Sequence, residues 1–149
     1  MTERPKPENR DAYMYFQTMT TRWMDNDSYR HMNNTTYYSF FDTIVNQYLI
    51  ENDVLDVERS SVIGLVAETT CRYFKSIGFP SRINVGLRVG HLGNSSIRYE
   101  IGLFKDDEDG ASAQGHFVHV CVDRESGRPT AIPEKMKSVV APLCRAATQ

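Results

Sequence analysis

Two aspartates stand immediately before a strongly amphipathic segment of this chain. They are Asp25 and Asp27, and the pattern that begins about ten residues later predicts a helix. The first backbone N–H groups of a helix have no intrahelical partner and lie at the positive end of the helix dipole, so they can bind a polarised carbonyl or an oxyanion. A carboxylate beside such a helix end therefore has an electrophile to act on, either as a nucleophile or as a general base.

The helix is predicted from apolar residues that recur at spacings of three and four. These are Tyr37, Phe40, Phe41, Ile44, Val45, Tyr48 and Leu49. The residues between them are mostly polar, so one face of the helix should be buried and the other exposed. We expect Asn33, Asn34 or Thr35 to cap its N-terminus.

The rest of the chain predicts strands. The segment 13–23 is rich in aromatic and β-branched residues, and a second strand is expected over 62–74. Apolar residues then alternate with others over 83–90 and 96–103, and a further strand follows at 112–123, so these strands should form an antiparallel meander. A short helix over 133–140, with proline in its first turn, ends the pattern. This order predicts an α+β protein whose sheet covers the apolar face of the helix.

Length and composition fit one globular domain. The chain has 149 residues, of which 40% are hydrophobic and 24% charged. The polar, proline-punctuated segment 1–11 is predicted to be a flexible tail, and 12–149 a single domain. Lysine and arginine total 17 against 19 acidic residues, with no basic run, which argues against a nucleic-acid partner. The start is unlike a signal peptide and no stretch approaches the ~20 apolar residues of a membrane span, so we expect a cytoplasmic protein without membrane association.

Metal and cofactor chemistry finds little support. The three cysteines, an odd number without close pairs, are expected to be reduced thiols. His116 and His119 lie three apart on a predicted strand, so they should point to opposite faces rather than share a metal. Motifs of nucleotide-binding proteins, zinc proteases and serine hydrolases do not occur. We therefore expect neither a metal nor a cofactor.

The segment 25–38 resembles the opening of the 4-hydroxybenzoyl-CoA thioesterase-like branch of the hotdog-fold superfamily. That pattern is roughly D-x-D-x-x-G-H-V-N-N followed by an aromatic-rich helix, and here it reads D-N-D-S-Y-R-H-M-N-N-T-T-Y-Y. The resemblance implies a hotdog fold, in which an antiparallel sheet wraps around one long helix. It further implies an acyl-CoA thioesterase that hydrolyses the thioester bond to free acid and CoA. Members form homodimers or homotetramers with ligand sites between subunits.

Within this resemblance, Asp27 matches the aspartate that attacks the thioester carbonyl or activates water. The backbone N–H of Asn34 is the best match for the group that binds the oxyanion, with Asn33 and Thr35 as alternatives. The same pattern also suits an ordinary Asx turn, in which Asp27 only ends a strand. The family usually has glycine where this chain has Arg30, and an arginine would strain the turn if that position needs a positive φ.

Further residues are candidates for contact with the substrate. His31 could orient the carboxylate or shape the pocket, and Tyr37 could line the acyl pocket as well as the core. The hairpin 93–96 resembles a G-x-S-S element of the family near the CoA path, which adds Asn94, Ser95 and Ser96. Candidate cations for the CoA phosphates, which could equally belong to a solvated sheet face, are Arg72, Lys75, Arg88 and Arg98.

Two other functions compete with thioester hydrolysis. One is a non-catalytic hotdog module that binds acyl-CoA as a sensor or scaffold, against which the Asp27 carboxylate argues. The other is a hotdog hydratase or dehydratase, which needs an active-site histidine in a different motif, and His31 is a weak match. The sequence leaves open the acyl group and the choice between a nucleophilic and a general-base role for Asp27.

Overall fold

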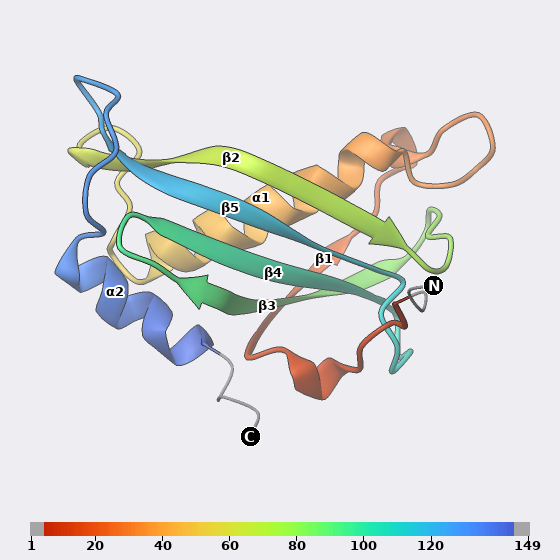
Figure 1. Ribbon diagram of the computed structural model, residues 1–149. Coiled ribbons are helices and arrows are strands. Elements are labelled where there is room, and N and C mark those ends of the chain that lie inside the picture. The colour runs from red at the N-terminus through yellow and green to blue at the C-terminus, as the bar shows by residue number, and fades with distance from the viewer. Residues whose placement is uncertain (1–4, 145–149) are drawn as a thin grey trace.

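The computed structural model describes residues 5–144 as five antiparallel strands in one sheet, with a helix packed across one face (Figure 1). In chain order the elements are η1 (Arg10–Ala12), β1 (Tyr15–Thr20), η2 (Trp23–Asp25), α1 (Asn34–Glu51), β2 (Val62–Tyr73), β3 (Arg82–Leu92), β4 (Ser96–Lys105), β5 (Ala113–Asp123), α2 (Glu134–Val140) and η3 (Ala141–Leu143). The predicted α+β arrangement is confirmed.

The strand order in the sheet is β1-β3-β4-β5-β2. β3, β4 and β5 are neighbours in sequence and in space, so the predicted meander is confirmed. β2 pairs with β5 at one edge of the sheet, and β1 pairs with β3 at the other. Most residues of β2 are exposed, including Leu65 and Val66, which are about half exposed. The outer edge of β2 has no strand partner in the described part of the chain.

Helix α1 has 18 residues and begins where the sequence predicts. The Asn33 side chain accepts a hydrogen bond from the Thr35 backbone N–H at 3.0 Å, which makes Asn33 the N-cap. All seven residues of the predicted apolar stripe are buried: Tyr37, Phe40, Phe41, Ile44, Val45, Tyr48 and Leu49. The spacing of apolar residues thus predicted both the helix and the face that it buries.

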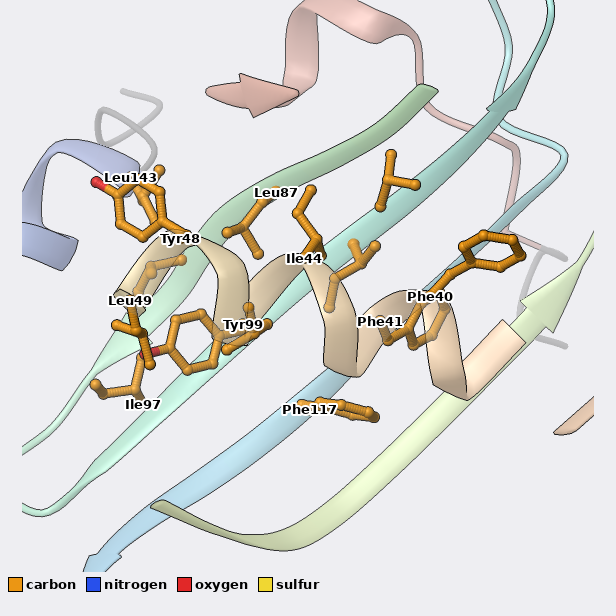
Figure 2. Packing of buried hydrophobic residues seen from close by; sticks show 14 of the residues in the cluster. Phe40, Phe41, Ile44, Tyr48, Leu49, Leu87, Ile97, Tyr99, Phe117 and Leu143 are labelled. Carbon is orange, nitrogen blue, oxygen red and sulfur yellow. The ribbon is translucent and has the colours of Figure 1, made fainter. Parts of the chain in front are cut away.

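The stripe of α1 packs against the inward-facing side chains of β3, β4 and β5. Figure 2 shows Phe41 and Ile44 directed from the helix toward the sheet, with Leu87, Tyr99 and Phe117 opposite them. The rings of Phe41 and Phe117 meet edge to face at 5.9 Å. The alternation along β3 and β4 is confirmed, because its apolar members form the core beneath the helix.

The opposite face of the sheet is covered in part by the N-terminal segment. The Tyr13 ring lies 4.7 Å from the Arg88 guanidinium, which is ion-paired with Glu8 and with Glu100. Arg88 is only 8% exposed and its charge is compensated, so its assignment as a candidate cation for phosphate is wrong. Residues 1–4 of the predicted tail lie outside the described residues. In the described part of the tail, the Arg10 side chain donates to the Asn84 side chain at 2.6 Å.

Several predicted element boundaries differ from the structure by one to three residues. β1 ends at Thr20, short of the predicted residue 23, because the chain turns where the Arg22 backbone N–H donates to the Asp25 carboxylate at 2.7 Å. α2 begins at Glu134, and Pro133 is its N-cap. Within residues 5–144, no helix has both the length and the apolar character that a membrane crossing requires.

Candidate active site

The loop between η2 and α1 is held at both ends by backbone hydrogen bonds. The Asn33 N–H donates to the Asp25 carbonyl at 2.7 Å, and the Met32 N–H donates to the Ile77 carbonyl at 2.6 Å. The Asp25 carboxylate is buried and ion-paired with Arg22 at 2.9 Å. Asp25 therefore stabilises the turn, while the loop that it anchors presents Asp27 to the surface.

One oxygen of the Asp27 carboxylate holds the loop together. Oδ1 accepts hydrogen bonds from the backbone N–H groups of Tyr29 at 2.8 Å and His31 at 3.2 Å, which is an Asx-type turn. Oδ2 has no hydrogen-bond partner in the described part of the chain. The structural and the chemical interpretations of Asp27 are therefore compatible, since each uses a different oxygen.

Arg30 adopts a left-handed backbone conformation, with φ at 65°. Its N–H donates to the Asp27 carbonyl at 3.1 Å, so this conformation closes the loop around the carboxylate. A non-glycine residue in the left-handed region costs roughly 1–2 kcal/mol. The position does need a positive φ, and the arginine keeps the loop under backbone strain.

We expect Arg30→Gly to raise the free energy of unfolding by about 0.5–1 kcal/mol. Glycine removes the left-handed penalty, and its larger entropy in the unfolded chain offsets part of the gain. Urea denaturation measures the change, with Arg30→Ala as the control that removes the same side chain but keeps the Cβ. Equal midpoints for the glycine and alanine variants would show that strain at this position is not the cause.

At the N-terminus of α1, the Asn34 backbone donor differs from those of Thr35 and Thr36. The Asn33 cap occupies the Thr35 N–H, and the Thr36 N–H donates to the Asn33 carbonyl at 2.9 Å. The Asn34 N–H makes no hydrogen bond to the described residues. Asn34 is thus the helix-end position from which an N–H can reach a ligand.

Asp27 and Asn34 line the same open hollow, whose volume is about 520 Å³. The hollow brings together six of the predicted site residues: Asp27, His31, Asn33, Asn34, Tyr37 and Lys75. Sequence reasoning missed its other walls, Met32, Tyr73, Phe74 and Ser76. The end of the predicted strand at 62–74 could have indicated Tyr73 and Phe74, but only the fold shows that this strand end meets the start of α1.

Part of the wall of the hollow is aromatic, formed by Tyr37, Tyr73 and Phe74. Tyr37 and Tyr73 meet edge to face at 4.8 Å. Burial raises the pKa of the Tyr37 hydroxyl to about 12, with smaller contributions in the same direction from Cys71 and Asp27. Burial also raises the pKa of the Cys71 thiol to about 11. Both groups stay protonated near neutral pH, so neither Tyr37, which lines the hollow, nor Cys71, which does not, supplies a nucleophile there.

Four predicted site residues lie away from this hollow. Asn94, Ser95 and Ser96 belong to the β3–β4 hairpin, which lies at the opposite end of the sheet from the start of α1 (Figure 1). The Asn94 carbonyl accepts from the Ile132 N–H at 2.9 Å, so the hairpin is fixed to the segment before α2. Arg72 lies on the outer face of the sheet, in a polar hollow shared with Arg98 and Glu100. Within one chain, none of the four meets Asp27.

The two histidines of β5 face opposite sides of the sheet, as predicted. His119 is buried against Tyr99 and Phe117 on the helix side. His116 lies on the outer side, where it bonds to Thr70 and Glu68. Among residues 5–144, no three histidine, cysteine or acidic side chains are placed to hold a metal ion together.

Comparison with known proteins identifies the class to which this fold and site belong. Residues 21–140 match the family model of the thioesterase-like superfamily. The match covers most of the chain and includes the Asp27 loop, α1 and the whole meander. The chain therefore belongs to the thioesterase-like superfamily, and its fold is the hotdog fold.

Individual proteins are also similar to this chain. The PA5185 protein of Pseudomonas aeruginosa is 51% identical in sequence, with a TM-score of 0.92 over 97% of this chain and 100% of that one. PA2801 of the same organism, for which a thioesterase function has been proposed, is 28% identical, with a TM-score of 0.78 over 86% of this chain and 98% of that one. The uncharacterised protein YsmA of Bacillus subtilis is 22% identical over 136 residues, which is 91% of each chain.

Proposed function

We propose that this protein is an acyl-CoA thioesterase that works at the hollow between the Asp27 loop and the start of α1. The observation that carries the proposal is that one hollow is lined by two groups without a hydrogen-bond partner among residues 5–144, the Asp27 Oδ2 oxygen and the Asn34 N–H. A basic oxygen and a free N–H donor are the two groups that thioester hydrolysis requires. The thioesterase function proposed for PA2801 supports the same chemistry.

In the reaction, the Asn34 N–H would polarise the thioester carbonyl and stabilise the oxyanion that forms from it. As a general base, Asp27 would take a proton from water while the water oxygen bonds to the carbonyl carbon. The tetrahedral intermediate then breaks its C–S bond, and the thiolate leaves and is protonated. As a nucleophile, Asp27 would instead form a mixed anhydride, which water hydrolyses. Both routes yield a free acid and a free thiol.

The experiment that tests the proposal measures free thiol released from a panel of acyl-CoA thioesters with short aliphatic, long aliphatic and aromatic acyl groups. A thioesterase releases thiol from at least one class, at a rate proportional to enzyme. A non-catalytic module binds acyl-CoA without releasing thiol, and a hydratase changes the acyl chain while the thioester stays intact. Either of those results would reject the proposed hydrolysis.

Lys75 is the cation of the hollow and the best candidate for contact with the CoA phosphates. Its ammonium group pairs with Glu108 at 3.1 Å, and both side chains are well exposed, so a phosphate can compete for it. We expect Lys75→Ala to raise KM for acyl-CoA several-fold at low salt while kcat changes little, because the contact is made equally in ground and transition states. Steady-state kinetics measure both parameters. Lys137→Ala, which removes a cation on α2, is the control, and an equal rise in KM for both variants would contradict this role of Lys75.

We also expect the protein to be a dimer or a larger assembly in solution. The outer edge of β2 presents backbone donors and acceptors along 12 residues, and such an edge favours pairing with a second copy. Light scattering should therefore give at least twice the chain mass of 17.1 kDa. A monomer that still hydrolyses thioesters would contradict both the assembly and the need for a shared site.

A further inference from the structure

A second cavity, of about 290 Å³, lies at the other end of α1. Its walls come from α1, the segment after it, β2, β4, β5 and α2. They are mainly apolar and include Leu49, Leu55, Val57, Ile63, Ile97 and Met136. It shares no lining residue with the Asp27 hollow. The nearest α1 residue of this cavity, Asn46, lies 12 positions after Asn34, which is about 18 Å along a helix.

One polar side chain in this apolar setting lacks a partner. His119 lines the cavity and is only 7% exposed, and neither nitrogen of its ring has a hydrogen-bond partner in the described part of the chain. Nε2 is fully covered by neighbouring atoms, so Nδ1, on the side of Gly64, is the nitrogen that a ligand can reach. Its ring is fixed in place, stacked on Phe117 at 5.8 Å and in edge contact with Tyr99 at 5.2 Å. Buried polar atoms in folded proteins are nearly always hydrogen-bonded, so an unpaired imidazole at a cavity wall needs an explanation.

The imidazole is held in its neutral form. Burial lowers the pKa of His119, and the opposing effect of the Asp42 carboxylate does not compensate for it. A neutral imidazole has one N–H donor and one nitrogen acceptor, so it can pair with an uncharged hydroxyl group. Arg124 also lines the cavity, but its guanidinium already donates to the backbone carbonyls of Ser60 and Val57, so an uncharged ligand suits the mainly apolar walls best.

The size of the cavity sets the size of the ligand. An apolar cavity of about 150 Å³ in another protein accommodates benzene. A cavity of 290 Å³ therefore has room for a group of about two rings, or for a branched aliphatic group of similar volume.

We propose that this cavity binds an uncharged aromatic or branched aliphatic group, of up to two rings, whose hydroxyl group hydrogen-bonds to His119. The ligand chemistry has two possible sources, a free small molecule or the acyl part of a thioester held at the Asp27 hollow of another subunit. The existence of the site does not depend on the proposed thioesterase activity. Only the second source, the acyl part of a thioester, rests on that activity.

The test compares the binding of two probes, 2-naphthol and naphthalene, which differ by one hydroxyl group. Isothermal titration with the full chain should show tighter binding of 2-naphthol by about tenfold, the ratio expected for one good hydrogen bond. His119→Phe keeps an aromatic ring for the contacts with Phe117 and Tyr99 but cannot accept the hydroxyl. We expect this variant to bind both probes equally. His116→Phe, a matched change on the outer face of the same strand, should keep the preference.

A second variant tests the site in case His119→Phe does not fold. A Cβ built at Gly64 would lie 3.1 Å from the His119 Nδ1 atom, so Gly64→Ala places a methyl group against the imidazole without removing it. We expect it to weaken binding of 2-naphthol several-fold while thermal unfolding stays cooperative. The proposal is overturned if the wild type binds neither probe, if it binds them equally, or if a folded His119→Phe variant keeps the preference.

The source of the ligand is distinguished in the hydrolysis assay. If the cavity takes the acyl part of the substrate, 2-naphthol should raise KM in competition with the thioester. If the natural ligand is a free molecule, 2-naphthol should bind without competing. Either pattern supports the site, and the titration result stands even where no thioesterase activity is found.

Discussion

Asp27→Asn should lower kcat on the best thioester substrate by a factor on the order of 10² to 10⁴. The change removes the charge and the basicity that either proposed route requires, and loss of a covalent route could cost more. The loop should survive, because the asparagine Oδ1 can still accept the hydrogen bonds from the Tyr29 and His31 N–H groups. Steady-state kinetics should therefore show a collapse of kcat with an unchanged melting temperature and little change in substrate binding.

Asp25→Asn is the matched control for this experiment. Asp25 has the same side chain two residues earlier, but its carboxylate is buried and bonded to Arg22. Its replacement should lower stability while kcat stays close to that of the wild type. A folded Asp27→Asn variant with near wild-type kcat would reject Asp27 as the catalytic residue.

Gly115→Ala should be among the most destabilising single changes in the molecule. A Cβ at this position would lie 2.1 Å from the Thr70 carbonyl oxygen and 2.7 Å from the Phe41 ring. The first neighbour is backbone of the paired strand β2 and the second belongs to the buried face of α1, so neither can move without disturbing the sheet or the core. We expect a loss of about 3 kcal/mol or more, at the upper end of the range for overpacked cores.

Gly110→Ala provides the comparison, since a Cβ there meets no atom within 4 Å. It should change the free energy of unfolding by no more than about 0.5 kcal/mol. Chemical denaturation of both variants measures the difference. Similar midpoints for the two would show that the close packing of β5 against β2 and α1 is not required for stability.

The elements were predictable from sequence because each has its own local periodicity. The spacing of the apolar residues from Tyr37 to Leu49 predicts α1 and its buried face, and the sequence also offers Asn33 as one of three possible N-caps. The pairing of β2 with β5 had no local signal, since it joins segments about 50 residues apart. Local sequence patterns also gave no sign that Tyr13 covers the outer face of the sheet, or that Arg88 pairs with Glu8.

The candidate site was predicted where it is contiguous in sequence and missed where it is not. Asp27, His31 and Asn34 lie within eight residues of one another, and the structure places all three at one hollow. Tyr73 completes that hollow from the end of β2, which only the sheet topology brings near. The hairpin residue Ser95 was proposed from a short motif, and the fold of one chain keeps it at the far end of the sheet. A contribution from Ser95 to the proposed site would have to come from another subunit.

The most direct measurement is a crystal structure with an acyl-CoA analogue in which a CH₂ group replaces the thioester sulfur, so that the carbonyl remains but cannot be hydrolysed. The account predicts the carbonyl oxygen about 3 Å from the Asn34 nitrogen. It also predicts the carbonyl carbon about 3–3.5 Å from the Asp27 Oδ2 atom, or one water molecule between them. An ordered analogue whose carbonyl lies far from Asp27 in every subunit would contradict the proposed active site.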